Sequence, residues 1–307
     1  MVRIGPWRGS PGALGVAGEE GARAGDRSVD ETSAGRHIVC AYDAADRLLG
    51  YAFLFPKAPA GGRRELYLDL HVRPGLANDR EVRDRLFDAI LERANRMAEA
   101  EPQWAVRLQA VCPADGAEAI AYLEGRGLAR CANGYVMARS LAEPLPEVPA
   151  PEGVEVRPWR MESEEEQRHY LEAHNAAFPD GPWDWAMLQY LLRSPMWAVG
   201  TTLTAFAGDS IVGSLLAYWN EAENRRTGER VGSTEEVFVV PGWRRRGIAR
   251  CLIAHGLRYL RDHGLAEARL ELSADNAAAL ALYHSMGYQV VCKQVLLAKE
   301  IARGGRG

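Results

Sequence analysis

The sequence predicts a mixed α/β fold arranged as two tandem domains, and three observations support this prediction. The chain has 307 residues, about twice the length of a common domain of ~150 residues. In the second half, short apolar runs typical of strands alternate with helical patterns in the order β-α-α-β-β-β-α-β-α-β. The first half repeats the later part of this order, which indicates an internal duplication. We expect each domain to be a mixed central sheet flanked by helices.

A proline-rich stretch marks the boundary between the two halves. Residues 142–153 contain Pro144, Pro146, Pro149 and Pro151 with acidic residues between them. Because proline has no backbone N–H donor, such a stretch favours an extended linker. We therefore expect five parts: a Gly-rich, poorly ordered segment 1–36, a domain 37–141, the linker 142–153, a domain 154–298 and a tail 299–307.

The second half holds the more complete set of predicted elements. Residues 248–263 carry apolar side chains at helical spacing and stop at Gly264, which predicts a helix. The continuous apolar run 237–240 is typical of a strand that is buried on both faces. The other predicted elements are strands at 154–159, 199–207, 211–219, 270–272 and 288–297, helices at 164–177, 184–192 and 276–286, and a loop at 220–232.

The first half matches the later part of this pattern. Its predicted elements are strands at 38–42, 49–55, 66–72 and 106–111, helices at 81–99 and 117–124, and a closing strand at 135–138. Two sequence landmarks recur at a period near 160 residues, namely Val72-Arg73-Pro74 against Val239-Val240-Pro241 and Gly127-Leu128 against Gly287-Tyr288. The Gly-rich first 36 residues do not predict an opening β-α-α, so we expect this copy to be truncated.

Composition excludes several classes of protein. The formal net charge of -4 and the pI near 6.0 argue against a general nucleic-acid binder. No apolar stretch reaches the ~20 residues of a membrane helix, and no signal peptide is evident. The five cysteines form no C-x-x-C pair, and the histidines have no metal-binding spacing. We therefore expect a cytoplasmic protein with no metal, no membrane partner and no nucleic-acid partner.

An arginine-glycine loop between strand 237–240 and helix 248–263 is the first candidate for chemistry. The first turn of a helix offers free N–H groups and a partial positive charge, and a loop with small residues lets a pyrophosphate approach these groups. The pattern Arg244-x-x-Gly247-x-Ala249 meets this requirement. Cationic side chains surround the same point at Arg244, Arg245, Arg246 and Arg250. Taken alone, a run of arginines is more typical of a solvated basic turn, and the strand before it and the helix after it favour the anion site.

The second candidate lies in helix 276–286. Asn276 and Tyr283 are seven residues apart and therefore share one helix face, and Gly287-Tyr288 ends the helix. Asn276 could be only an N-cap and Tyr283 only a core aromatic.

Together the two candidates resemble the GNAT superfamily of N-acetyltransferases over about residues 154–298. The resemblance implies that acetyl-CoA is the acetyl donor. It also implies that pantetheine pairs with the backbone of Val237 and Val239, that the loop amides hold the pyrophosphate, and that Tyr283 lies near the thioester sulfur. The cofactor-binding residues implied in this way are Val237, Phe238, Val239, Arg244, Arg245, Arg246, Gly247, Ile248, Ala249, Arg250 and Asn276.

The expected reaction is direct attack of an amine on the acetyl thioester. A base must remove a proton from the amine, and the Tyr283 hydroxyl can protonate the departing thiolate. The Val239 N–H is a candidate for stabilising the oxyanion. The candidate bases are Glu235, Glu236 and Glu271, and Glu271 occupies the position that resembles the catalytic glutamate of ribosomal-protein alanine acetyltransferases. Each of these carboxylates alone is more typical of a solvated or ion-paired surface group.

The acceptor is less visible in the sequence. An aromatic and acidic cleft would suit a small cationic amine, although core packing of the same aromatics is the simpler interpretation. The residues concerned are Phe178, Asp180, Trp183, Trp185, Tyr218, Trp219 and Glu221. Small-molecule amines and peptide N-termini both stay open as acceptors, and so do a monomer and a homodimer.

The first copy departs from the motif. It has no arginine-glycine loop, acidic residues crowd its helix start, and Leu123 and Gly116 stand in place of Tyr283 and Asn276. We therefore expect a degenerate domain that scaffolds or covers the acceptor site. The tandem layout is similar to that of the mycothiol synthases, and a protein N-terminal acetyltransferase is an alternative. The rival from another class is a non-catalytic acetyl-CoA-binding or interaction protein.

Overall fold

The computed structural model describes residues 2–6, 38–57, 59 and 61–301. The chain forms two compact units, of which unit 1 is Met1–Ala132 with Gln294–Gly307 and unit 2 is Asn133–Lys293. Most of the predicted segment 1–36 and of the tail 299–307 lies outside the described residues. The exception near the N-terminus is strand β1 (Arg3–Gly5), which pairs with the next strand and so differs from the poorly ordered segment expected there.

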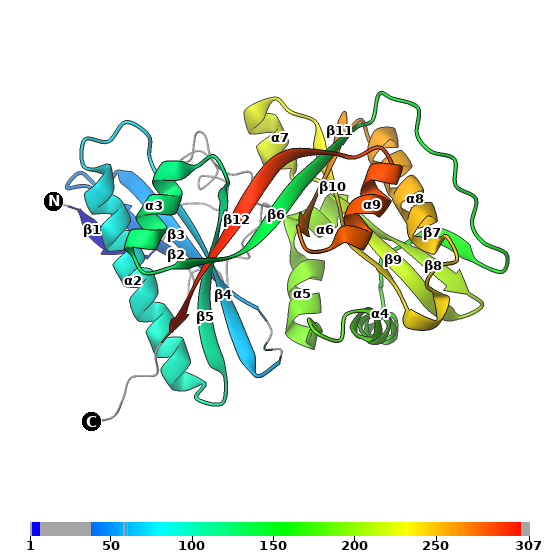
Figure 1. Cartoon of the computed structure of the whole chain (residues 1–307), viewed down its shortest axis with the longest axis horizontal. Coiled ribbons are helices and arrows are strands. Elements are labelled where there is room, and N and C mark those ends of the chain that lie inside the picture. Colours follow the sequence, from blue (N-terminus) through cyan, green and yellow to red (C-terminus); the bar gives the residue numbers. More distant parts are fainter. Residues whose placement is uncertain (1, 7–37, 58, 60, 302–307) are drawn as a thin grey trace. The chain divides into compact units, whose positions relative to one another are not determined.

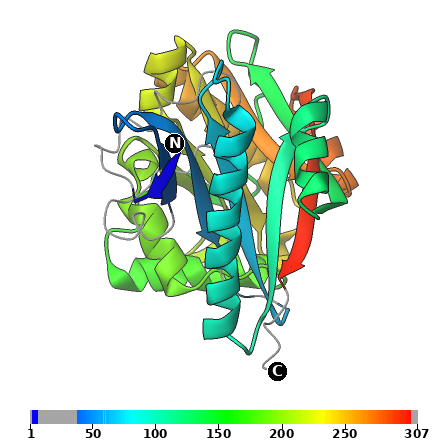
Figure 2. The same ribbon diagram turned by 90° about the vertical axis from the view of Figure 1, so that its left-hand side faces the viewer.

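Unit 1 is a mixed sheet with helices on one face. Its strand order is β1-β2-β3-β4-β5-β12, with β2 at Ile38–Tyr42, β3 at Leu48–Pro56, β4 at Arg63–Val72 and β5 at Ala105–Pro113. Helix α2 (Asp79–Ala100) runs along this sheet as the cyan helix of Figure 2. Helix α3 (Ala117–Gly125) packs beside it, with the Phe87 and Tyr122 rings edge to face. Both helices bury their apolar faces in one core.

Unit 2 is a mixed sheet with helices on both faces. Its strand order is β6-β11-β10-β9-β8-β7 (Figure 1). The strands are β6 (Ala129–Ser140), β7 (Glu155–Trp159), β8 (Thr201–Ala207), β9 (Ser210–Tyr218), β10 (Val231–Val239) and β11 (Glu267–Ser273). Helices α8 (Ile248–Asp262) and α9 (Ala277–Ser285) contribute to the core on one face. On the other face lie α4 (Glu164–Ala177), α5 (Trp185–Arg193) and α6 (Pro195–Val199).

Local sequence explains where the main helices begin. Ser163 and Glu166 form a reciprocal capping box at the start of α4. In α8, the buried side chains of Leu252, Leu257 and Leu260 recur at helical spacing and face the sheet. These two helices hold the opposite faces of β9 and β10, which are the central strands of unit 2.

The last strand of each repeat pairs with strands of the other repeat rather than with strands of its own. Strand β6, the predicted closing strand of the first half, pairs antiparallel with β11 of unit 2 from Ser140↔Glu267 to Gly134↔Ser273. Strand β12 (Gln289–Ile301), the predicted closing strand of the second half, pairs antiparallel with β5 of unit 1 from Gln294 to Ile301. The compact units therefore differ from the predicted domains 37–141 and 154–298, because the two final strands are exchanged.

A smaller difference concerns the predicted loop 220–232. Residues Glu221–Thr227 form helix α7, capped by the Asn220 side chain, and β10 begins at Val231. The Asn224 side chain bonds both the N–H and the C=O of Val231, so the helix is fastened to the start of the strand. Polar capping residues of this kind give no apolar periodicity, which is why the helix was not predicted.

The duplication is visible in the way two corresponding helices end. After α9, the Tyr288 N–H donates to the Tyr283 carbonyl and the Gly287 N–H donates to the His284 carbonyl. After α3, the Leu128 N–H donates to the Leu123 carbonyl and the Gly127 N–H donates to the Glu124 carbonyl. Both glycines have positive φ, at 88° and 85°. The matching turns support the alignment of Leu123 with Tyr283.

Gly287→Ala should destabilise the protein strongly. Besides the strain of φ 88°, a Cβ at this position would lie 1.5 Å from Nη1 of Arg139. The Arg139 side chain is buried and donates to the Met286 and Pro144 carbonyls, so moving its guanidinium aside would break these hydrogen bonds. We expect a loss of about 2–4 kcal/mol in the free energy of unfolding, measured by urea unfolding.

Gly127→Ala is the matched control for this substitution. It has the same backbone strain, but its Cβ would meet only the flexible end of Lys299, at 3.2 Å. It should therefore cost about 1 kcal/mol. Equal losses for the two variants would contradict the role assigned to Arg139.

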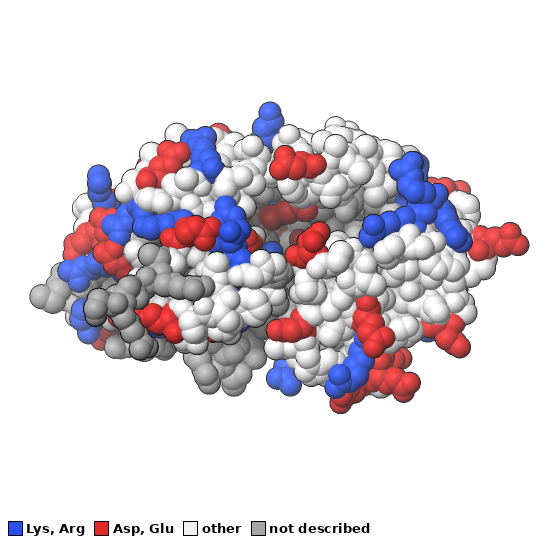
Figure 3. All heavy atoms as spheres, turned by 60° about the horizontal axis from the view of Figure 1, so that its bottom comes forward, with Lys and Arg blue, Asp and Glu red and all other residues white. Residues whose placement is uncertain are grey.

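The surface is mixed in charge. On the face drawn in Figure 3, acidic and basic side chains lie interspersed, in keeping with the net charge of -4. Within the described residues, no helix is long and apolar enough to cross a membrane.

Candidate active site

The candidate site forms where two parallel strands of unit 2 part. Strands β10 and β11 pair from Val231↔Glu267 to Ser233↔Arg269, and no pair between them follows Ser233. Beyond that point β10 keeps its antiparallel partner β9, and β11 keeps β6. Residues Thr234–Val239 therefore present one edge of β10 without a strand partner, which we call the open edge. An extended ligand can bind such an edge as an added strand.

A β-bulge interrupts β10 at the open edge. Glu235 pairs with Leu216 and Phe238 pairs with Ser214, so β10 has one extra residue between these pairs. Glu236 lies inside the bulge with φ 49°, in the left-handed region that costs a non-glycine residue about 1–2 kcal/mol. Such strain is common at functional sites. In a regular strand Thr234 and Phe238 would lie on the same face. Because of the bulge, Thr234 faces Gly256 of α8, whereas Phe238 lies in the core beside α4 on the other face.

The backbone of Val239 is the next feature of the open edge. The Val240 N–H donates to the Val212 carbonyl on β9, at 3.1 Å. Because successive N–H groups of a strand point to opposite edges, the Val239 N–H points to the open edge. The Val239 carbonyl accepts a hydrogen bond from Nε of Arg244, at 3.1 Å. Arg244 also donates to the Ala177 carbonyl at the end of α4, so its side chain ties β10 to α4.

The arginine-glycine loop leads into the first turn of α8, and no side chain caps the backbone N–H groups of that turn. Gly247 is the N-cap, with φ 87° and no side-chain capping bond, and Arg245 has φ 67°. The first intrahelical bond comes from the Cys251 N–H, so the N–H groups of Ile248, Ala249 and Arg250 precede the helical ladder. Positive φ at Arg245 and Gly247 is typical of loops whose amides converge on an anion.

The charge at this helix start is positive. Within the described part of the chain, no carboxylate pairs with Arg244, Arg245, Arg246 or Arg250. Arg246 packs over the Trp243 ring at 4.6 Å and bonds the Gly242 carbonyl. The first turn of α8 also contains no acidic residue. The helix dipole and the arginines therefore act in the same direction and favour an anion.

Tyr283 approaches the open edge from α9. Its side chain is 9% exposed, and its ring packs against that of Tyr288 at 5.6 Å. Burial, and to a lesser degree the charges of Glu235 and Glu236, raise the pKa of Tyr283 to about 12. Tyr283 belongs to the same apolar cluster as Val237 and Val239 of the open edge. Asn276, at the start of α9, is an N-cap whose Oδ1 accepts from the Ala279 N–H at 3.0 Å.

Three carboxylates gather on the α4 side of the strands. Glu235 accepts a hydrogen bond from the Tyr218 hydroxyl at 2.9 Å, and Glu236 reaches His174 of α4. Burial raises the pKa of Tyr218, with a further contribution from the charge of Glu235 and a smaller one from the charge of Glu271, which is exposed on β11. The structure thus brings the three candidate bases and Tyr283 to one region of unit 2.

Sequence reasoning missed His174, Asn175 and the role of Tyr218. His174 is completely buried, and Trp183 and Phe178 pack around its ring at 4.2 and 4.9 Å. Only the proximity of a histidine to the aromatic segment 178–185 could have signalled it, since its partner Glu236 is 62 residues away.

The predicted acceptor aromatics are largely packing residues. Phe178, Trp183 and Trp185 pack against the core beside α4. Trp219 packs against the rings of Tyr259 and His263, and Glu221 pairs with Arg225 within α7. Phe178 and Trp183 still border the site, because they enclose His174.

The corresponding part of unit 1 lacks these features. Strand β4 pairs with β3 from Gly50↔Val72 to Pro56↔Leu66 without a register shift, so it has no bulge. Asp79 and Glu81 occupy the first turn of α2, where unit 2 has uncompensated arginines. Leu123 lies where α9 has Tyr283, and it packs in the core.

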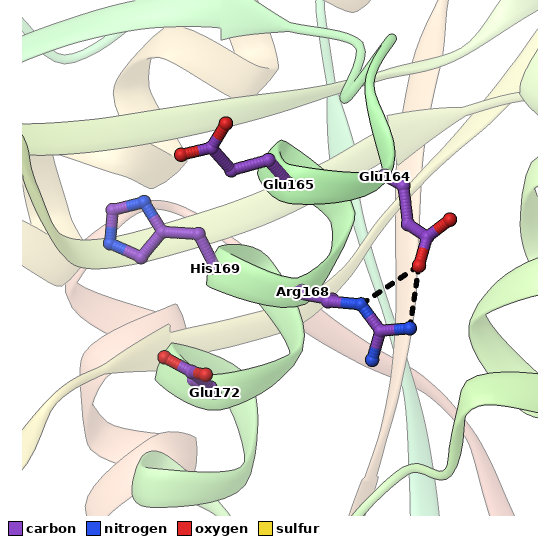
Figure 4. A pocket seen from close by; sticks show the side chains of 5 residues that line it. All are labelled: Glu164, Glu165, Arg168, His169 and Glu172. Carbon is purple, nitrogen blue, oxygen red and sulfur yellow. Dashed lines mark hydrogen bonds and ion pairs between the residues drawn. The ribbon is translucent and has the colours of Figure 1, made fainter.

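An open depression on the outer side of α4 is separate from this region. Figure 4 shows that its lining residues Glu164, Glu165, Arg168, His169 and Glu172 all project from one helix, with Arg168 bound to Glu164. The arrangement is that of a solvated helix surface. Within the residues that the structure describes, no three His, Cys, Asp or Glu side chains are grouped to hold a metal ion.

Comparisons with known proteins agree with this architecture. A model of the acetyltransferase (GNAT) family matches residues 158–288. The mycothiol acetyltransferase of Thermobispora bispora is 30% identical over 261 residues, covering 83% of this chain and 80% of the relative. The mycothiol acetyltransferase of Saccharomonospora viridis is 31% identical over 281 residues, covering 88% and 86%.

Solved structures show the same fold. A tandem GNAT protein from the clavulanic acid biosynthesis pathway superposes with a TM-score of 0.72 at 16% identity, covering 98% of this chain and 99% of its own. A GCN5-related N-acetyltransferase from Sphaerobacter thermophilus gives a TM-score of 0.64 at 24% identity, covering 87% and 81%. By sequence and by fold, the chain belongs to the GNAT family of acetyltransferases and is an acyltransferase.

Proposed function

We propose that the protein is an acetyl-CoA-dependent N-acetyltransferase with a single site in unit 2, acting on a small-molecule primary amine. The observation that carries the proposal is the meeting of an open strand edge, an uncapped helix start rich in arginine and a buried tyrosine. The free amides of Ile248, Ala249 and Arg250 suit a pyrophosphate, and the open edge suits an extended amide chain such as pantetheine. Acetyl-CoA supplies the activated acetyl group.

The residues of the site divide the chemistry between them. One carboxylate of the group Glu235, Glu236 and Glu271 accepts a proton from the substrate ammonium, which frees the nitrogen lone pair for attack on the thioester carbonyl. The Val239 N–H, which points to the open edge, stabilises the oxyanion in this proposal. Tyr283 donates its hydroxyl hydrogen to the departing sulfur. Arg245, Arg246 and Arg250 add positive charge beside the helix start, while Arg244 keeps β10 and α4 together.

The relatives favour a particular first substrate. Several proteins that share about 30% identity with this chain over most of its length carry the name mycothiol acetyltransferase. The acceptor to test first is therefore the deacetylated primary amine of mycothiol. The concentration of carboxylates near the open edge would also suit a cationic amine before it loses its proton.

A thiol-release assay tests the proposal. Acetyl-CoA is incubated with the protein and a panel that contains deacetylated mycothiol, amino sugars, polyamines and peptides with free N-termini. CoA, separated by chromatography from any thiol of the acceptor, should form with deacetylated mycothiol, and mass spectrometry should show one added acetyl group on nitrogen. Binding of acetyl-CoA without turnover for any amine would instead favour a non-catalytic acetyl-CoA-binding protein.

Calorimetry with CoA should give one binding site per chain. The reason is that Asp79 and Glu81 place negative charge at the start of α2, where a pyrophosphate would be repelled. The control is Ala249→Glu, described below, which should abolish the single isotherm. Two equivalent sites in the unmodified chain would contradict the assignment of one site to unit 2.

A further inference from the structure

His174 is a buried ionisable residue to which the mechanism above gives no task. Its side chain is completely buried among the rings of Tyr170, Phe178, Trp183 and Phe238. Burying an imidazole in such an apolar shell is costly unless both ring nitrogens have partners. Both do, since Nδ1 lies 3.0 Å from Oδ1 of Asn175 and Nε2 lies 3.4 Å from Oε2 of Glu236.

The Asn175 amide fixes the proton on Nδ1. Its Nδ2 donates to the Trp183 carbonyl at 2.8 Å, and its Oδ1 accepts from the Trp183 N–H at 2.8 Å. A reversed amide would set donor against donor and acceptor against acceptor, so this orientation is the only one that satisfies both backbone groups. The atom that faces Nδ1 is therefore an acceptor. It follows that Nδ1 carries a hydrogen and donates it to Asn175.

The other ring nitrogen then faces a carboxylate. A neutral imidazole with its hydrogen on Nδ1 has a lone pair on Nε2, and an ionised Glu236 also presents only lone pairs. Two acceptors do not attract each other across 3.4 Å in a buried place, so a proton lies between Nε2 and Oε2. Because Glu236 keeps a side chain that is 35% exposed whereas His174 keeps 1%, the carboxylate still reaches solvent.

We propose that His174 is a positioning residue that selects Glu236, rather than Glu235 or Glu271, as the base. The proposal rests on the proposed N-acetyltransferase function. The Nε2–H of His174 donates to Oε2 and fixes the orientation of the carboxylate, and the bulge at Glu236 directs the side chain toward α4. The other carboxylate oxygen, Oε1, is the one that accepts the proton of the substrate ammonium.

The proton balance of the step is simple. An N–H bond of the substrate ammonium breaks, its electron pair stays on nitrogen, and an O–H bond forms at Oε1 of Glu236. The nitrogen lone pair then attacks the thioester carbonyl. The C–S bond breaks as Tyr283 gives its hydrogen to the sulfur, and the second proton that the nitrogen must lose passes to the Tyr283 oxygen. After the product leaves, Glu236 returns its proton to water, and His174 takes part in no proton transfer. The Trp183 backbone takes part indirectly, because it orients Asn175 and thereby His174.

Nitrogen NMR of the imidazole side chains locates the two hydrogens without any need for turnover. In the full-length protein we expect His174 to show Nδ1 and Nε2 both protonated, the signals being assigned by their loss in His174→Phe. In Glu236→Gln the Nε2 signal should move into the unprotonated range while Nδ1 stays unchanged. An unprotonated Nδ1, or an Nε2 signal that Glu236→Gln does not move, would overturn the proposal.

A pair of substitutions separates positioning from packing. Gln at position 174 can still donate an amide N–H toward Glu236 but packs poorly among rings, whereas Phe packs well and donates nothing. With an active acceptor, His174→Phe should lower kcat by about 10- to 100-fold, and His174→Gln should retain more of the kcat. The Kd for acetyl-CoA should change in neither variant.

The reverse order of kcat values, with Phe the better residue, would show that His174 only fills the core. Thermal melting checks that both variants fold. If His174→Phe does not, His174→Gln assigns the imidazole signals and the NMR experiment decides the question. If the unmodified protein acetylates no amine, the proposed function fails while the NMR experiment still tests the His174–Glu236 pair.

Discussion

Tyr283→Phe should lower kcat by about 100- to 10,000-fold while leaving the Kd for acetyl-CoA nearly unchanged. The phenylalanine ring keeps the packing against Tyr288 and the buried position in α9. What it removes is the only hydrogen that the side chain can give to a departing sulfur. The measurement is kcat from thiol release, together with Kd from calorimetry.

The raised pKa of Tyr283 predicts how this residue behaves with pH. Since burial and the two glutamates hold the pKa at about 12, the hydroxyl stays protonated across the range in which the enzyme is assayed. A thiolate formed at the same place would be destabilised by the same burial and the same negative charges. The pKa of the thiol and the pKa of the phenol are therefore raised together. The difference between them, which sets the free energy of proton transfer from phenol to sulfur, changes little. Ionisation of Tyr283 should cause no fall in kcat below about pH 11.

Tyr288→Phe is the control for the loss of a buried phenol. The Tyr288 hydroxyl shares a 2.6 Å hydrogen bond with Thr234, so its removal should cost about 1 kcal/mol of stability. It should leave kcat within a few-fold of the unmodified protein. A similar fall in kcat for Tyr288→Phe and Tyr283→Phe would show that packing, rather than proton donation, explains the first result.

Ala249→Glu should weaken acetyl-CoA binding by about 100-fold or more while slightly stabilising the fold. Residue 249 is in the first turn of α8, among the amides proposed to hold the pyrophosphate. A carboxylate there repels an anionic ligand, at a scale of about 4 kcal/mol for charges 4 Å apart near a surface. The same carboxylate interacts favourably with the helix dipole, by about 0.3–1 kcal/mol. Calorimetry and thermal unfolding measure the two opposite effects.

Ala249→Gln is the matched variant, because it has the same size without the charge. It should lose far less affinity than Ala249→Glu, and its weakening should not depend on salt. Since the arginines around the loop pair with no carboxylate among the described residues, high salt should also weaken binding to the unmodified protein. Equal effects of Glu and Gln would mean that the first turn of α8 does not hold the anion.

Local sequence patterns predict much of the fold and several residues of the candidate site. The apolar periodicity of α8, the glycines at 247 and 287 and the spacing of Asn276 and Tyr283 are all encoded within short segments. Such features depend on neighbours in the chain, so the mixed α/β elements and the tandem arrangement could be predicted.

Features that depend on distant partners could not be predicted in this way. His174 and Glu236 are 62 residues apart, and nothing in the helical pattern of α4 distinguishes a core histidine from one that faces a carboxylate. The bulge at Glu236 arises from an extra residue in the register between β10 and β9, which a single strand does not reveal. The sheet that each closing strand joins is likewise set by pairing partners and not by the alternation within β6 or β12.

Because the closing strands are exchanged, the chain cannot be divided at the proline-rich stretch without breaking strand pairs. Strand β6 pairs with β11 of unit 2 but precedes the proline-rich stretch 142–153 in the sequence. Strand β12 pairs with β5 of unit 1 but follows that stretch. A cut at the prolines would leave β11 and β5 each with a bare edge, and bare edges promote aggregation. Arg139, which bonds the end of the helix that carries Tyr283, would be lost with β6. Deletion of residues 1–141 should therefore disrupt unit 2, because its sheet would lose β6 and the end of α9 would lose Arg139.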